Sequence, residues 1–134
     1  MQIVLKNQPL EKQKVVQALE QFGRDHQLPA AVVQAADLAL EEHLTNLMKY
    51  SLSDNREHQI KVRFALASHF IIEVEDDGPP FNPLEVPAVD TAIPLDRRPI
   101  GGLGIHLMRR FMDEIEYHSE GGKNILRMQK RLPA

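Results

Sequence analysis

The sequence contains no cysteine and no tryptophan, and only 5% of its 134 residues are aromatic. Without cysteine the chain can form no disulfide, no thiolate metal site and no cysteine nucleophile, which fits a reducing compartment. It also lacks a run of about 18 apolar residues that could cross a bilayer. Its first residues lack the long apolar segment and the cleavage site of a signal peptide. We therefore expect a soluble, cytoplasmic protein.

A basic surface is also missing. The formal net charge is -3, and the lysines and arginines are dispersed except near the C-terminal tail. A nucleic-acid-binding protein usually clusters its positive charge, so direct binding of nucleic acid is not expected, nor is a membrane partner. The length suits one domain over residues 1–134 with one apolar core.

Hydrophobic periodicity predicts an alternation of helices and strands. The expected strands cover about 2–6, 60–65, 70–75, 114–119 and 125–131, and the expected helices cover about 9–27, 29–51 and 101–112. A Gly121-Gly122 turn joins the last two strands. Residues 77–99 hold six of the nine prolines and show little periodicity. A loop of that length inside a compact domain is usually functional, so we interpret it as an active-site lid.

Glu42 and Asn46 stand four residues apart in the second expected helix, so both project from one face, one turn apart. The amide oxygen of Asn46 suits Mg²⁺, a hard cation that takes few protein ligands. A carboxylate one turn away can accept a proton from a hydroxyl or water that attacks a γ-phosphate. An ordinary exposed helix shows the same pair, so both interpretations stay open. His43 points about 100° away and is expected at the surface or the edge of the core.

The segment Asp76-Asp77-Gly78 follows the apolar strand expected over 70–75. The Asp76 carboxylate can accept a hydrogen bond from an adenine amino group, and Gly78 can let the backbone approach a flat base. The alternative is an ordinary Asp-Gly turn.

The segment Gly101-Gly102-Leu103-Gly104 opens the third expected helix. Free N–H groups at such an entry suit phosphate, although the spacing matches neither a Walker A loop nor a dinucleotide fingerprint. A glycine-rich hinge is the alternative. The joint occurrence of all three segments, in this order, favours a pocket for ATP and a metal ion.

Together these segments resemble three motifs of the GHKL ATPase superfamily, which includes gyrase and the histidine kinases. Glu42-x-x-x-Asn46 resembles the N box, Asp76-x-Gly78 the G1 box and Gly102-x-Gly104 the G2 box. Within the superfamily the closest resemblance is to the bacterial anti-sigma factor serine/threonine kinases, through residues 98–109, 112–117 and 122–126. The resemblance extends over about residues 30–132.

The resemblance implies an α/β fold, a Bergerat-type two-layer sandwich in which a mixed, mostly antiparallel sheet carries helices on one face and a mobile lid closes over ATP. It implies that Glu42 is the general base, that Asn46 binds Mg²⁺ and that Asp76 reads the adenine amino group. Further residues implied to bind ATP are Gly78, Gly102, Leu103 and Gly104, together with Arg97 or Arg98 at the γ-phosphate.

The function implied by the resemblance is that of a serine/threonine protein kinase that phosphorylates a STAS-domain anti-anti-sigma protein in a partner-switching system. Implied partners are that protein, a sigma factor or both, and a second copy of the chain. One alternative is an ATP-dependent module that sequesters a partner without phosphotransfer, and another is a plain interaction domain. Two positions depart from the family pattern. Relatives often have His where this chain has Tyr50, and Asp where it has Asn82.

Overall fold

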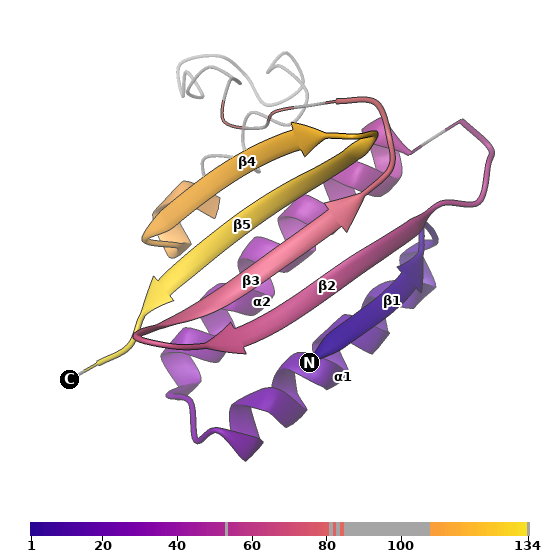
Figure 1. Cartoon of the computed structure of the whole chain (residues 1–134). Coiled ribbons are helices and arrows are strands. Elements are labelled where there is room, and N and C mark those ends of the chain that lie inside the picture. Colours follow the sequence, from indigo (N-terminus) through magenta and orange to yellow (C-terminus); the bar gives the residue numbers. More distant parts are fainter. Residues whose placement is uncertain (53, 81, 83, 85–107, 134) are drawn as a thin grey trace, which may run out of the picture.

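The chain forms a five-stranded sheet with helices packed on one of its faces (Figure 1). The computed structural model describes residues 1–52, 54–80, 82, 84 and 108–133. The strands are β1 Gln2–Lys6, β2 Gln59–Leu66, β3 His69–Asp76, β4 Glu114–Glu120 and β5 Lys123–Arg131. They are ordered β1-β2-β3-β5-β4, and every neighbouring pair is antiparallel. The expected α/β two-layer sandwich is confirmed, and within the described residues its sheet is antiparallel throughout.

Two long helices cover the sheet. A short 3-10 turn, η1 Pro9–Glu11, leads into α1 Lys12–Asp25, and α2 Ala30–Asn46 continues as the π-helical segment η2 Leu47–Ser51. Pro9 stands in the first turn, where its missing N–H costs no helical bond. The sequence predicts both helices correctly but not the π geometry, in which the Leu52 amide donates to the Leu47 carbonyl at 2.8 Å.

The core lies between the sheet and the helices. Side chains of β2 and β3 alternate between buried and less buried positions, as a sheet with one covered face requires. The register places Val62 opposite Val74 and Phe64 opposite Ile72, and all four side chains are buried. From α1, Phe22 stacks on Phe70 with ring centroids 5.5 Å apart. This register turns one apolar face toward the helices.

The remaining expected elements agree where the chain is described. Gly121 and Gly122 form the turn between β4 and β5 with φ angles of 60° and 76°, a conformation that favours glycine. Of the helix expected over 101–112, residues 108–111 are described and helical, and Met108 and Met112 are buried in the core. Most of the expected lid lies outside the described residues. Among those that are described, no helix combines the length and apolar character needed to cross a bilayer.

Candidate functional site

Asp76 is the last residue of the central strand β3, and its side chain is buried. Strand β3 pairs with β2 as far as Lys61 and Glu75, whereas its pairing with β5 extends one residue further, to Asp76 and Asn124. Asp76 is only 5% exposed and stands opposite Asn124 in the register. Buried carboxylates need hydrogen-bond partners, and the fold supplies them locally and from β5.

Asn124 connects Asp76 to its surroundings. Its Nδ2 donates to Asp76 Oδ1 at 3.0 Å and to the Gly78 carbonyl oxygen at 2.9 Å. Its Oδ1 accepts from the Tyr117 hydroxyl at 3.0 Å and from the Ser119 hydroxyl at 2.8 Å. Asn124 therefore holds the end of β3, the following turn and β4 in one network.

Sequence reasoning did not assign Asn124 a role, although one signal was available. Along β5 the inward positions are Asn124, Leu126 and Met128, so a polar residue stands where the alternation calls for an apolar one. A polar side chain at an inward position needs a partner. The sequence does not show that this partner is Asp76.

Burial raises the pKa of the Asp76 carboxyl above its ordinary value, and the charge of Asp77 adds to this effect. The hydrogen bonds from Asn124 and from the Gly78 amide, at 2.9 Å, act in the opposite direction. Both of these bonds end on Oδ1. Among the described residues Oδ2 has no recorded hydrogen bond, so it can accept one from a ligand.

Packing leaves no room for a side chain at Gly78, independently of any contact with an adenine ring. A Cβ at this position would lie 2.5 Å from Leu52 Cδ2 and 3.2 Å from the Ser51 carbonyl oxygen. The chain end of η2 therefore lies directly against the turn after β3. This contact brings the carboxyl ends of α2 and β3 to the same end of the molecule (Figure 1).

Glu42 and Asn46 lie on the last turns of α2 and are both half-buried. Asn46 Nδ2 is buried and has no hydrogen-bond partner among the described residues, an arrangement that is uncommon in folded proteins and that a ligand or water would satisfy. Directly after Asn46 the helix widens into the π segment, a geometry often found at functional sites. Asn46 and the turn after β3 therefore lie at the same end of the molecule.

His43 is a core residue and not, as expected, a surface or core-edge one. It is 5% exposed, and burial lowers its pKa to about 4, so the imidazole is neutral at physiological pH. The 100° rotation from Glu42 turns His43 inward toward the sheet. His43 therefore does not share the partly exposed face on which Glu42 and Asn46 lie.

A second polar contact braces the turn that carries Asp76. His58 lies 2.7 Å from Asp77 Oδ1 through Nδ1 and 2.8 Å from Asp54 Oδ1 through Nε2. The two carboxylates, that of Asp54 first, raise the His58 pKa. The loop between α2 and β2 is therefore tied to the turn after β3.

The other predicted site residues are not placed by the structure. Arg97, Arg98, Gly102, Leu103 and Gly104 lie outside the described residues. Their assignment to the nucleotide stays a prediction, as do the roles of Glu42, Asn46, Asp76 and Gly78.

Comparison with known proteins identifies the family to which this chain belongs. The profile of the histidine kinase-like ATPase domain matches residues 6–130. The chain belongs to this family. The GHKL resemblance of the motifs is thereby confirmed at the level of the superfamily.

Solved structures share the fold of this ATPase domain. The RsbU and RsbW domains of Rv1364c from Mycobacterium tuberculosis superpose with a TM-score of 0.66 at 14% identity, covering 98% of this chain and 31% of that one. A blue-light activated histidine kinase, EL346, from Erythrobacter litoralis gives a TM-score of 0.56 at 20% identity, covering 78% and 32%. The chain thus spans about a third of the length of these relatives. No curated protein sequence matches it.

The described residues fit the nucleotide that domains of this family bind, usually with Mg²⁺. Asp76 is buried, and its Oδ2 has no hydrogen bond from any described residue, which suits an adenine amino donor. The Asn46 amide is half-buried, and its nitrogen has no hydrogen-bond partner in the part of the chain that the structure describes, while its oxygen is of the kind that binds a hard cation. Bound there, Mg²⁺ would supply positive charge beside the phosphates.

Proposed function

We propose that this ATPase domain is a serine/threonine protein kinase that phosphorylates a STAS-domain anti-anti-sigma protein within a partner-switching system. The observation that carries the proposal is the pair Glu42 and Asn46, half-buried on one face of α2, at the same end of the molecule as Asp76. The resemblance of residues 98–109, 112–117 and 122–126 to anti-sigma factor kinases supports it. The fold shared with an RsbW domain is consistent with it.

Glu42 is the residue proposed to take the proton. A serine hydroxyl attacks the γ-phosphorus of ATP, its oxygen forms a bond to phosphorus, and the bond to the ADP oxygen breaks. The hydroxyl proton passes to the Glu42 carboxylate, which needs to lie within hydrogen-bond reach of the hydroxyl. Asp76 accepts a hydrogen bond from the adenine amino group and so orients the nucleotide. Arg97 or Arg98 is proposed at the γ-phosphate.

Phosphotransfer to a purified STAS-domain protein with γ-labelled ATP and Mg²⁺ tests this function. Wild type should label a serine or threonine of the partner. Glu42→Gln should lower the transfer rate by roughly 10²–10⁴-fold, the usual contribution of a general base, with ATP affinity retained in calorimetry. Glu41→Gln is the matched control, because Glu41 is exposed and pairs with Lys12 on α1 at 2.8 Å. Normal transfer by Glu42→Gln would show that Glu42 is not the base.

The same experiment separates the alternative, an ATP-dependent module that sequesters its partner. In that case partner affinity differs between ATP and ADP, and no phosphorylated product forms. Calorimetry with Asn46→Ala and Asp76→Ala tests the nucleotide pocket that both functions share. If wild type binds no adenine nucleotide, both functions are wrong and a plain interaction domain is left.

A further inference from the structure

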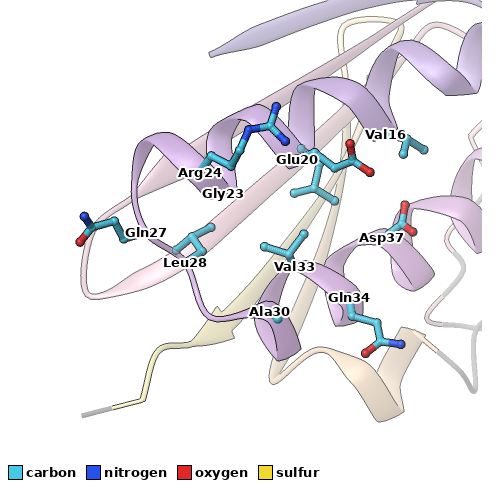
Figure 2. Close-up of a pocket in the computed structure, with 11 residues that line it drawn as sticks. Val16, Glu20, Gly23, Arg24, Gln27, Leu28, Ala30, Val33, Gln34 and Asp37 are labelled. Atoms are coloured by element: carbon cyan, nitrogen blue, oxygen red, sulfur yellow. The ribbon is translucent and has the colours of Figure 1, made fainter.

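A groove of about 620 Å³ lies between α1 and α2, on the side of the molecule where the two helices are joined (Figure 2). The helices pack tightly at its base, since a Cβ on Gly23 would lie 2.9 Å from Val33 Cγ2. Its apolar lining comes from both helices and their connection: Val16, Leu19, Leu28, Ala30 and Val33. The volume lies in the range of ordinary binding sites.

Two carboxylates that form no ion pair with any described residue line this groove. Figure 2 shows the side chains of Glu20 and Asp37 extending toward the same part of the gap, one from each helix. Neither forms an ion pair among the described residues. Burial raises the Asp37 pKa, and the charges of Glu41 and Glu20 raise it further. The neighbouring Glu41 differs, because Lys12 neutralises it.

Arg24 is a cation in the lining of the groove, but it does not neutralise Glu20 and Asp37. Arg24 donates a hydrogen bond to Gln21 Oε1 on its own helix at 3.0 Å. In Figure 2 its side chain extends along α1 toward Glu20, but no ion pair joins Arg24 to either carboxylate among the described residues. The groove therefore combines an apolar floor with unbalanced negative charge at one position along its length.

We propose that the α1–α2 groove docks a helical segment of a partner protein that presents apolar side chains together with one or two lysines or arginines. A groove between two helices accommodates an amphipathic helix through anchors at i, i+3, i+4 and i+7. A cation on such a helix meets the carboxylates of Glu20 and Asp37, and charge complementarity of this kind favours one partner over others.

The groove is separate from the nucleotide site. On α2, Asp37 stands five residues before Glu42 and nine before Asn46, which corresponds to about 7.5 and about 13.5 Å along a helix. Figure 1 places the α1–α2 connection at the end of the molecule opposite the last turns of α2. Docking in the groove thus adds a partner surface that phosphotransfer at Glu42 does not require.

The test uses the full chain, isotopically labelled, and a synthetic peptide of about 15 residues with leucines at helical spacing and two arginines on one flank. The control peptide carries glutamates in place of the arginines. Amide chemical shifts should change along α1 and α2 around Gly23 and Val33 with the basic peptide only. Titration by fluorescence anisotropy then gives the affinity.

The double variant Glu20→Gln/Asp37→Asn should weaken binding of the basic peptide roughly tenfold, since about 1.4 kcal/mol of lost pairing corresponds to a factor of ten. Glu114→Gln/Glu116→Gln removes the same charge from exposed positions of β4 and should leave the affinity unchanged. Equal weakening by both variants, shifts at another surface, or binding of the acidic peptide would each overturn the proposal. Concentration-dependent self-association through the groove would also overturn it.

Discussion

The substitution Asp76→Asn separates the proposed reading of adenine from the structural role of this side chain. Asn keeps an oxygen that can accept the hydrogen bonds now made by the Gly78 amide at 2.9 Å and by Asn124 Nδ2 at 3.0 Å. With that oxygen held in place, the amide NH₂ takes the position of Oδ2. It then presents donors to the adenine amino group, which is itself a donor.

The expected loss of affinity follows from one hydrogen bond. A bond to a charged acceptor contributes about 1.5–3 kcal/mol, which corresponds to a Kd for ATP that rises roughly 10- to 150-fold. Stability should change in the other direction. Burial raises the Asp76 pKa, so holding this carboxylate ionised in the fold opposes folding, and a neutral amide removes that opposition. The free energy of unfolding should therefore be unchanged or higher at neutral pH.

The sign of the pH dependence gives an independent check. Because the folded pKa lies above the ordinary value of 3.8, the unfolded carboxyl loses its proton first as pH rises. The contribution of Asp76 to stability accordingly falls between pH 3.8 and the higher folded pKa. Asp76→Asn should lack this part of the pH dependence.

Isothermal titration with ATP and Mg²⁺ and urea denaturation across pH would measure both effects. Asp25→Asn is the matched control, since it removes the same charge from an exposed position at the end of α1, outside the network of Asp76. ATP affinity equal to wild type in Asp76→Asn would refute the adenine role. A loss of stability in Asp76→Asn would refute the account of the buried charge.

Three further predictions concern stability measured by urea denaturation. Gly78→Ala should lower the free energy of unfolding by about 1–3 kcal/mol, because its Cβ would lie 2.5 Å from Leu52 Cδ2. Added Leu52→Val should make the combined loss smaller than the sum of the single losses. Asn124→Ala should lower the free energy of unfolding by about 1–3 kcal/mol, because it removes the hydrogen bonds to the buried Asp76 carboxylate and to the half-buried Gly78 carbonyl. His58→Gln should destabilise most below pH 6.5 and least once the pH passes the raised pKa of His58.

Each of these outcomes can fail in a distinct way. Additive losses in the Gly78 and Leu52 variants would show that the two positions do not press on each other. Wild-type stability of Asn124→Ala would mean that water replaces its hydrogen bonds. A His58→Gln effect that grows as pH rises would contradict the ion pairs with Asp54 and Asp77, whose strength depends on a protonated ring.

Local patterns in the sequence already determined the helices and strands, and the part of the candidate site that lies on α2. The alternation of β2 and β3 and the helical spacing of α1 and α2 are consequences of backbone geometry over a few residues, so they appear without knowledge of the fold. The same holds for Glu42 and Asn46, whose shared face follows from a spacing of four. The Gly121-Gly122 turn is local too.

Tertiary structure alone decided which of these elements meet. Asn124 reaches Asp76 across 48 positions of sequence because β5 enters the sheet beside β3. Gly78 is confined by Leu52, and Glu20 faces the same gap as Asp37, for similar reasons of packing. Such contacts depend on strand order and on the faces that pack together. Short-range periodicity predicts neither of these. The sequence thus shows which side chains share one face of a helix or strand. The packing of the sheet and helices decides which side chains of other elements they contact.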